Sequence, residues 1–499
     1  MRTISRSFLV ALLCVGCARQ PAPTATLQPS GKPRNVIVII GDGMGAQQVG
    51  LASLKTPFIG SGFSQLFERS TVGVHLPVSE SSIVNDSACS ATQLGSGCSC
   101  DPLQVGVNSS GRPCQSFLDV ARARGMRAGV VSDTRLTHAT PASFSVHVEH
   151  RGSEAEIAEK MASSGLDLLM SGGLSYFLPK DGDPSLKVEC ARLKAPGLRK
   201  DSRNLLRELQ GRGYAVACSQ DELSKLQTTP VLGLFAPSEM KDAYEEGTSG
   251  EPSLVEMTRR SFDLLDNPAG FALMVEAGQI DWAGHDNDPD WLFAEMKRMD
   301  GLLEFVEHFV DANPDTLVIV TGDHETGGFG FSYRRARDSD STNASSGGAL
   351  LHFPDLTDFW PMAGGRRSNR SILKEFFSLP EAEQTAATLA KLKGSANKQR
   401  AFTEKDAANF LACIAKDSGK PKVDESRCPL GPEYPYDTSS PAVLLGRPDS
   451  AASSVVWSTG AHTHTPVLVF AQGPGAEQFQ GVMSSAELGK RLVGIVGQQ

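Results

Sequence analysis

The residues with the clearest chemical potential are in the segment Asn85-Asp86-Ser87-Ala88-Cys89. Ser87 follows an aspartate and begins a run of small residues, which is typical of a nucleophile at the N-terminus of a helix. Free backbone N–H groups and the helix dipole stabilise an alkoxide and a phosphate oxygen there. Serine is also a common N-cap residue, so this motif alone favours a structural role. Four other polar clusters in the chain favour a catalytic role for Ser87 instead.

Two of these clusters follow apolar runs that predict buried strands. Asp42 comes after the β-branched run 35–40, and the adjacent Asp323 and His324 come after the run 316–321. Continuous runs of this kind are typical of parallel strands buried on both faces. Their carboxyl ends share one edge of an open α/β sheet, where such folds carry their sites.

A third cluster follows the run that ends at Glu276, and it contains Asp281 and His285. The spacing of four residues puts Asp281 and His285 on one face of a helix. A carboxylate and an imidazole in this arrangement suit Zn²⁺. The fourth cluster contains His462 and His464, immediately before the last apolar run 467–471.

In their order along the chain, these motifs resemble those of the alkaline phosphatases, from about Asn35 to the C-terminus. The matching motifs are Gly-Asp-Gly-Met-Gly, Asp-Ser-Ala-x-Ser-Ala-Thr, Ala-Thr-Pro with a downstream Arg, Glu-x-x-x-x-Asp-x-x-x-His, Thr-x-Asp-His-x-Thr-Gly-Gly, and His-Thr before the last strand. The resemblance implies a large, mostly parallel central sheet flanked by helices. It also implies that the protein hydrolyses a broad range of small phosphate monoesters with two Zn²⁺ ions and one Mg²⁺ ion.

The resemblance also assigns roles to particular residues. Ser87 is similar to the phosphorylated nucleophile, and Arg151 is similar to the arginine that clamps the phosphate with its planar fork. One zinc is assigned to Asp281, His285 and His462, the second to Asp42, Asp323 and His324, and the magnesium to Asp42, Thr140 and Glu276. In the family pattern, the histidine ligand lies eleven residues before a glycine that follows the last strand. His462 and Gly473 have this spacing, which favours His462 over His464 as the ligand.

Two positions depart from the enterobacterial form of the family. His138 stands where that form has an aspartate beside the magnesium, and Trp282 stands where it has a lysine near the phosphate. The pair is similar to the variant of some marine and cold-adapted bacterial members. We expect His138 to lie beside the third metal rather than to bind it. Trp282 is either a packing aromatic residue or a part of the substrate pocket.

Length and charge agree with one large α/β domain over residues 35–499. The candidate residues extend from Asp42 to His462, so one folded unit must bring them together. The formal net charge of −9 gives no basic patch for nucleic acid. The strand–helix alternation stops after Gly328, and we interpret residues from about 325 to 454 as an insertion. By resemblance it corresponds to the family's variable crown, near the interface of an expected homodimer.

Local patterns predict several helices. Ser153 and Glu156 are spaced as a capping box for a helix that ends at Ser164. A second helix is predicted from Cys114 to Arg124, and a long amphipathic one from Pro289 to Val310.

The N-terminus has the features of an export signal. Arg2 and Arg6 precede the apolar run 8–13, and small residues precede Cys17. Residues 1–17 are therefore a predicted signal peptide with Cys17 as a candidate lipidation site, and residues 18–34 are a predicted flexible linker. Lipidation places the protein on a periplasmic or outer-membrane surface, whereas simple cleavage gives a soluble periplasmic or secreted enzyme.

Eight cysteines follow the signal segment, and disulfides are permitted in an exported protein. Sequence-local pairs are expected for Cys190 with Cys218, for Cys413 with Cys428, and for Cys114 with Cys98 or Cys100. Cys89 is expected to be a buried free thiol in the nucleophile helix.

Two other functions remain open. One is a phosphodiesterase or sulfatase of the same superfamily, although Ser87 lacks the Cys/Ser-x-Pro-x-Arg setting of sulfatases. The other is a non-catalytic lipoprotein that binds phosphate or metal, which does not need a nucleophile.

Overall fold

The computed structural model describes residues 31–54, 59–183, 188–247, 250–335, 343–346, 349–353, 366–396, 402–417, 420–428, 440–452 and 454–498. The predicted signal peptide with Cys17 and most of the predicted linker lie outside the described residues.

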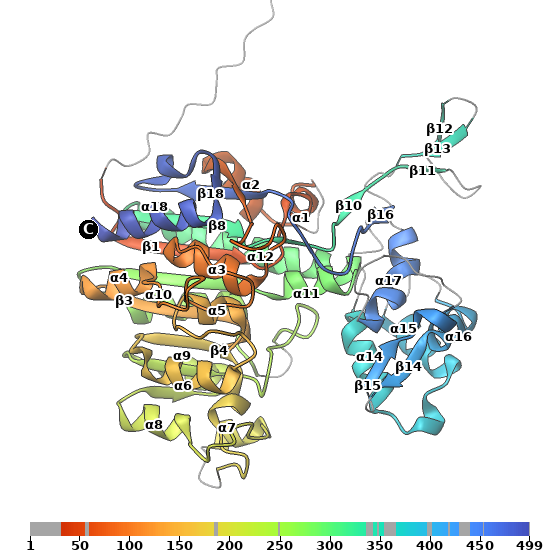
Figure 1. Cartoon of the computed structure of the whole chain (residues 1–499), viewed down its shortest axis with the longest axis horizontal. Coiled ribbons are helices and arrows are strands. Elements are labelled where there is room, and N and C mark those ends of the chain that lie inside the picture. The colour runs from red at the N-terminus through yellow and green to blue at the C-terminus, as the bar shows by residue number, and fades with distance from the viewer. Residues whose placement is uncertain are drawn as a thin grey trace, which may run out of the picture.

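A ten-stranded sheet forms the centre of the molecule (Figure 1). Its pairings are parallel except those of β18, which runs antiparallel to both of its neighbours. The predicted large, mostly parallel sheet is therefore confirmed. The strands in order across the sheet are β19 (Gly481–Ser484), β2 (Thr71–Leu76), β18 (Val467–Gln472), β8 (Thr316–Gly322), β1 (Asn35–Gly41), β7 (Phe271–Ala277), β3 (Arg127–Arg135), β4 (Leu168–Gly172), β6 (Val231–Leu234) and β5 (Ala215–Ala217).

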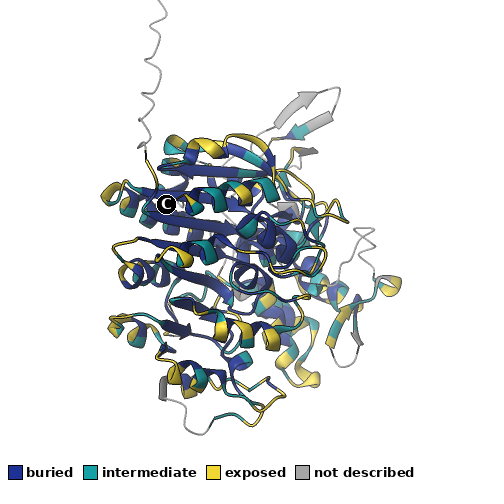
Figure 2. Ribbon diagram, turned by 60° about the vertical axis from the view of Figure 1, so that its left-hand side comes forward, coloured by how far each residue is buried: buried dark blue, intermediate teal, exposed yellow. Residues whose placement is uncertain are grey.

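The sequence of strand β1 is apolar throughout because the strand is buried on both faces of the sheet. Val36, Val38 and Ile40 belong to the core on one face of the sheet, whereas Ile37 and Ile39 belong to the core on the other. Side chains alternate between the faces of a strand, so only a continuous apolar run buries both. Figure 2 shows the strands as the most deeply buried layer, with exposed residues on the outer helices.

Helices cover both faces of the sheet. The first layer contains α3 (Ser87–Ser96), α4 (Phe117–Ala123), α5 (Ala139–Ser143), α6 (Glu154–Ser164), α7 (Val188–Arg192), α8 (Leu205–Gly211) and α18 (Ser485–Gly497). The second contains α1 (Ala46–Ala52), α2 (Gly62–Arg69), α9 (Gln220–Lys225), α10 (Leu254–Leu265), α11 (Gln279–His285) and α12 (Pro289–Ala312).

The predicted helix beginnings differ in accuracy. The long helix from Pro289 exists as α12, because Asp288 caps it and Pro289 occupies its first turn. The predicted capping box at Ser153 is wrong: α6 begins there, but the Ser153 backbone has ψ 50°, and its side chain makes no cap hydrogen bond. An N-cap normally has an extended backbone that aims its oxygen at the first turn. The helix predicted from Cys114 begins only at Phe117, where Ser116 and Asp119 form the capping box.

Between β8 and β18, which are neighbours in the sheet, the chain makes a long excursion. Its helices α14 (Asn369–Ser378), α15 (Ala386–Ala396), α16 (Glu404–Ala412) and α17 (Pro441–Ala452) share a small core of their own that includes Ile372, Phe376 and Phe410. Figure 1 shows this helical body to one side of the sheet. The strands β14 (Ile414–Asp417) and β15 (Lys420–Val423) form a hairpin within it. The predicted limits of the insertion and its correspondence to a crown stay predictions.

Four disulfides join the eight cysteines that follow the signal segment. The pairs Cys190–Cys218, Cys413–Cys428 and Cys98–Cys114 agree with the expected local pairing. The fourth pair, Cys89–Cys100, shows that the prediction of a free thiol at Cys89 is wrong. The segment after α3 folds back along the helix, which brings the two Cα atoms to 5.6 Å. This return of the chain has no signature in the sequence.

Candidate active site

Ser87 is the first residue of α3, and the helix is capped by Asp86, whose carboxylate accepts a hydrogen bond from the Cys89 N–H. The cap function therefore belongs to Asp86, and Ser87 is free for another role. The buried Ser87 hydroxyl is 3.2 Å from His324 Nε2 and 3.5 Å from Asp42 Oδ1. A hydroxyl at a helix N-terminus that faces two potential metal ligands is a candidate nucleophile.

The first ligand group surrounds this hydroxyl and comes from two adjacent strands. Asp42 follows β1, and Asp323 and His324 follow β8. His324 Nε2 is 3.5 Å from Asp42 Oδ1 and 3.4 Å from Asp323 Oδ2. The turn after Asp42 needs glycine at position 43, where φ is +73° and a Cβ atom would lie 2.7 Å from the Asp281 Cα.

The second group contains Asp281 and His285 from α11 and His462 from β17 (His462–Thr463). His285 Nε2 is 3.1 Å from His462 Nε2 and 3.4 Å from Asp281 Oδ2, and His462 Nε2 is 3.6 Å from Asp281 Oδ1. His464 is exposed. The structure thus brings His462 into the cluster, as the spacing to Gly473 favoured.

Backbone carbonyls orient both imidazoles of this group. His285 Nδ1 lies 2.7 Å from the Gly460 carbonyl oxygen, and His462 Nδ1 lies 2.9 Å from that of Asn85. A carbonyl only accepts, so each Nδ1 carries the proton and each Nε2 presents a lone pair. Two lone pairs that converge at 3.1 Å beside a carboxylate are an arrangement that a cation stabilises.

The third group contains Glu276 at the end of β7, Thr140 from α5 and again Asp42. The Thr140 hydroxyl donates to Asp42 Oδ2 at 3.1 Å. Ser132 and Thr134 both donate to Glu276 Oε2, and the buried Glu276 Oε1 has no hydrogen-bond partner. This free oxygen and Asp42 offer a small, oxygen-rich site of the kind that Mg²⁺ prefers.

His138 lies beside the third group. Its Nδ1 is 3.6 Å from Glu276 Oε1, and its Nε2 accepts a hydrogen bond from Arg151 Nη2 at 3.3 Å. A neutral imidazole that accepts at Nε2 carries its proton on Nδ1, so that proton points toward the Glu276 carboxylate.

The charges of the cluster are strongly perturbed because it is buried. Burial and the neighbouring Asp323, Asp281 and Glu276 hold the pKa of Asp42 well above its usual value, and burial raises the pKa of Asp323 to about 7. Burial also lowers the pKa of His324 to about 4. Burial, with the neighbouring His324, lowers the pKa of His462 to about 3. Several buried acids crowded together are typical of a site built for cations.

Arg151 is held beside the candidate nucleophile Ser87 by Asp86. Its Nη1 donates to Asp86 Oδ2 at 2.9 Å. Although burial alone raises the pKa of Asp86, the Arg151 guanidinium and the N–H groups of Leu103 and Cys89 bring it below its usual value. Asp86 therefore stays ionised and keeps the guanidinium next to Ser87.

Trp282 lies at the edge of the site against a residue of the helical body. Its ring is edge-on to His138 at 5.8 Å, and the Arg370 guanidinium from α14 lies 5.3 Å from the Trp282 ring centre. Arg370 is itself fixed by Asp286, at 2.9 and 3.1 Å. The long excursion after β8 thus reaches the rim of the site.

All the predicted site residues lie in this one region, and the structure adds others. Thr326 donates to Asp281 Oδ1 at 2.5 Å and lies 3.2 Å from His324 Nδ1. Asp86 and Thr326 stand inside quoted motifs, so their position was a usable signal. The orienting carbonyls of Asn85 and Gly460 had none, because every residue carries a carbonyl.

A candidate nucleophile, an arginine and three buried groups of potential metal ligands at one sheet edge form an arrangement that fits a metal-dependent hydrolase of anionic esters. The sequence matches the model of the family "Alkaline phosphatase" over residues 33–400. The chain belongs to the alkaline phosphatase family, whose members are phosphoric monoester hydrolases.

Individual relatives agree with this assignment. Alkaline phosphatase 4 of Bacillus subtilis is 28% identical over 96% of this chain and 93% of its own length. The structure of the cold-active alkaline phosphatase from Shewanella sp. is 26% identical, with a TM-score of 0.68 over 93% of this chain and 99% of that one. The Thermus thermophilus alkaline phosphatase is 25% identical, with a TM-score of 0.76 over 97% and 95% of the two chains.

Proposed function

We propose that the protein is an exported alkaline phosphatase that hydrolyses small phosphate monoesters through a phosphoserine intermediate on Ser87. The observation that carries this proposal is the Ser87 hydroxyl, which lies at a helix N-terminus, within 3.5 Å of His324 and Asp42, with Arg151 held beside it by Asp86. Ser87 also lacks the Cys/Ser-x-Pro-x-Arg setting of sulfatases.

The donor set supports two zinc ions and one magnesium ion. Asp281, His285 and His462 offer one carboxylate and two converging Nε2 atoms, a set that suits Zn²⁺. The group of Asp42, Asp323 and His324 suits a second Zn²⁺, and the buried Asp323 Oδ2 has no hydrogen-bond partner of its own. We assign Mg²⁺ to Asp42, Thr140 and Glu276, with His138 as a neighbour because its Nδ1 proton faces Glu276.

In the first step, the Ser87 hydroxyl releases its proton to the solvent, its oxygen attacks the phosphorus atom, and the bond from phosphorus to the ester oxygen breaks. The alcohol leaves with a proton from the solvent. In the second step, water attacks the same phosphorus and the bond to the Ser87 oxygen breaks. The serine oxygen takes up a proton, and inorganic phosphate is released. Bound metal ions lower the pKa of the hydroxyl and of water and neutralise the leaving oxygen.

The chain's own groups hold the phosphoryl group in line for these steps. The guanidinium of Arg151 matches two phosphoryl oxygens, and the positive end of the α3 dipole lies at Ser87. Donors fixed in advance do not have to reorganise as charge develops.

Two alternative functions have weaker support. A phosphodiesterase must accommodate a second ester group at the phosphorus, whereas Arg151 and the third ligand group here surround it with charge. A phosphate- or metal-binding lipoprotein does not need a buried serine hydroxyl directed at the ligand cluster.

Export is the remaining part of the proposal. Four disulfides are typical of an oxidising compartment, and they support the predicted signal peptide. In the described part of the chain, no helix is long and apolar enough to cross a membrane. We propose a periplasmic, lipid-anchored or secreted homodimer.

The Ser87→Ala variant tests the mechanism. We expect it to bind inorganic phosphate but to lose turnover of an aryl phosphate by several orders of magnitude, because the nucleophile is missing. Turnover close to that of the wild type contradicts the phosphoserine route. Wild-type rates with an aryl phosphate, a bis-aryl phosphate and an aryl sulfate separate the monoesterase from the diesterase and the sulfatase.

A further inference from the structure

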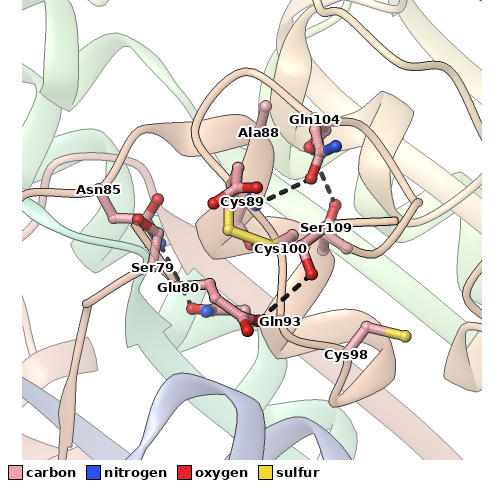
Figure 3. Close-up of a disulfide and its surroundings, with 12 residues drawn as sticks. Ser79, Glu80, Asn85, Ala88, Cys89, Gln93, Cys98, Cys100, Gln104 and Ser109 are labelled. Carbon is pink, nitrogen blue, oxygen red and sulfur yellow. Dashed lines mark hydrogen bonds between the residues drawn. A yellow bond between two sulfur atoms is a disulfide. The ribbon is translucent and has the colours of Figure 1, made fainter. Parts of the chain in front are cut away.

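The segment from Cys98 to Cys114, here called the clamp loop, lies between the nucleophile helix and the segment that carries Arg151. The disulfide Cys89–Cys100 joins it to α3, two residues after Ser87, and Cys98–Cys114 joins its two ends. Figure 3 shows the Cys89–Cys100 bond beside the first turn of the helix. Both cysteines of this pair are fully buried.

Leu103, within the clamp loop, contacts both sides with its main chain. Its N–H donates to Asp86 Oδ1 at 3.0 Å, and its carbonyl accepts from the Arg151 N–H at 2.8 Å. Since Asp86 also accepts from the Arg151 guanidinium, these three residues close a ring of hydrogen bonds next to Ser87.

The Leu103 backbone is unusual, and its side chain does not explain it. Its φ is +73°, in the left-handed region that bulky residues rarely adopt, and the residue is 41% exposed. The surrounding structure therefore imposes this conformation, and the conformation lets the N–H reach Asp86 while the carbonyl reaches Arg151.

Two further contacts tie the clamp loop to both sides. Val105 and Val148 exchange both backbone hydrogen bonds, at 3.0 and 2.8 Å. On the helix side, the Thr92 hydroxyl accepts from the Gly106 N–H at 2.8 Å. Arg151 itself lies in a turn rather than in a helix or strand.

We infer that the clamp loop sets the position of Arg151 relative to Ser87, and that Leu103 is a positioning residue that acts through its main chain. The inference rests on the proposed function of the site. An arginine in a turn can bind two phosphoryl oxygens only if its main chain is fixed, and small displacements at such a site are costly. The Cys89–Cys100 disulfide then matters for phosphate affinity as well as for stability.

The first experiment compares two substitutions at Leu103 in the metal-loaded protein by equilibrium dialysis with inorganic phosphate. Leu103→Pro removes the N–H and cannot adopt a positive φ, so we expect its Kd for phosphate to rise about tenfold. Leu103→Asn keeps the N–H, and asparagine tolerates the left-handed region, so we expect a Kd within about twofold of the wild type. Equal affinities in the two variants overturn the inference.

The second experiment removes one disulfide at a time. We expect the pair Cys89→Ala and Cys100→Ala to weaken phosphate binding about tenfold, because the clamp loop loses its bond to α3. The matched control is the pair Cys190→Ala and Cys218→Ala, which loses a disulfide outside the clamp loop and keeps its phosphate affinity. Equal losses of affinity in the two pairs overturn the inference, and thermal melts show which variants are folded.

These measurements distinguish this inference from the proposed function. If the wild type binds phosphate more tightly than Leu103→Pro but does not hydrolyse aryl phosphate, the proposed function is contradicted and the inference about the clamp loop is supported. If the wild type hydrolyses the ester and Leu103→Pro binds phosphate normally, only the inference about the clamp loop is contradicted.

Discussion

Each imidazole of the ligand cluster has its Nδ1 engaged by a neighbouring oxygen, which leaves Nε2 for the centre of the site. The partners are the Gly460 carbonyl for His285, the Asn85 carbonyl for His462 and the Thr326 hydroxyl for His324. Ligand geometry is therefore set as much by these partners as by the ligands themselves.

The two histidines of the last motif provide a test at the residue scale. His462→Ala should lose about one zinc ion per chain, because this substitution removes one of the three proposed ligands of that ion. His464→Ala should keep its zinc, since this side chain is exposed and outside the group. Elemental analysis of both purified variants measures this, and the reverse pattern contradicts the choice of His462.

A second prediction concerns His75, which is buried beneath the site between Ser485 and the Gly322 carbonyl, both at 2.9 Å. Burial lowers its pKa from 6.5 to about 4. The unfolded chain therefore binds a proton that the folded chain does not bind. Neutral His75 therefore contributes to the free energy of unfolding. This contribution is complete above pH 6.5 and is lost as the pH falls toward 4, by about 3 kcal/mol in total.

The measurement is the free energy of unfolding of the metal-free protein at several pH values. The difference between the wild type and His75→Gln should shrink by about 3 kcal/mol from pH 7 to pH 4. His308→Gln, at an exposed position, is the control and should follow the wild type. A difference that is constant with pH contradicts the prediction.

At this scale the sequence predicted the side chains and missed their supports. Asp42, Ser87 and His462 stand in motifs with chemical meaning, and the structure brings them together. The Asn85 and Gly460 carbonyls and the partner of Cys89 depend on where loops return, which local sequence does not encode.

At the scale of elements, apolar runs predicted the strands because burial on both faces leaves little choice of residue. Helix beginnings were less predictable: Ser153 has the right type and spacing for a cap, but its backbone is not extended. A cap depends on the angle at which the chain enters the helix, and tertiary packing sets that angle.

The helical body after β8 has a buried ion pair that joins two of its helices. Lys393 of α15 bonds to Asp449 of α17 at 2.6 Å and to Asn369 of α14 at 2.5 Å. Lys393→Met leaves the Asp449 carboxylate buried without this cation, so we expect a loss of about 3–5 kcal/mol in the stability of this body. Chemical denaturation, together with limited proteolysis of residues 366–452, measures the effect.

Lys391, an exposed lysine on the same helix, is the matched control. Lys391→Met should change stability by no more than about 0.5 kcal/mol. If the two substitutions have equal effects, the Lys393–Asp449 pair does not hold these helices together. The double variant Lys393→Met with Asp449→Leu should recover part of the loss, because it removes the buried carboxylate together with its lysine partner.

At the scale of the whole molecule, the ligand groups join segments from both ends of the domain. Asp42 follows the first strand of the chain, and His462 precedes the last central strand, β18. Metal ions at the proposed sites would therefore join Asp42 to His324 and Asp281 to His462, which are far apart in the sequence, and we expect stability to be linked to metal occupancy.

Metal removal should consequently lower both activity and the melting temperature, and metal return should restore both. An ion present at about 1,000 times its Kd adds about 4 kcal/mol to stability, provided that it does not bind the unfolded chain. Dialysis against a chelator followed by Zn²⁺ and Mg²⁺, with melts at each stage, tests this. A melting temperature that does not change on complete removal of metal contradicts the proposed sites.

Rebinding of the metals should also release protons. In the metal-free cluster, burial and neighbouring carboxylates raise the pKa of Asp42 well above its usual value, and burial raises that of Asp323 to about 7, so Asp323 is partly protonated at neutral pH. Zinc binds the ionised carboxylates, so its apparent affinity should rise as the pH increases through 7. Isothermal titration calorimetry of Zn²⁺ binding at pH 7, in two buffers of different ionisation enthalpy, counts the released protons. Asp323→Asn removes one of these acids and should release fewer protons per zinc ion bound, whereas an unchanged number contradicts the assignment of Asp323 as a ligand that must lose a proton.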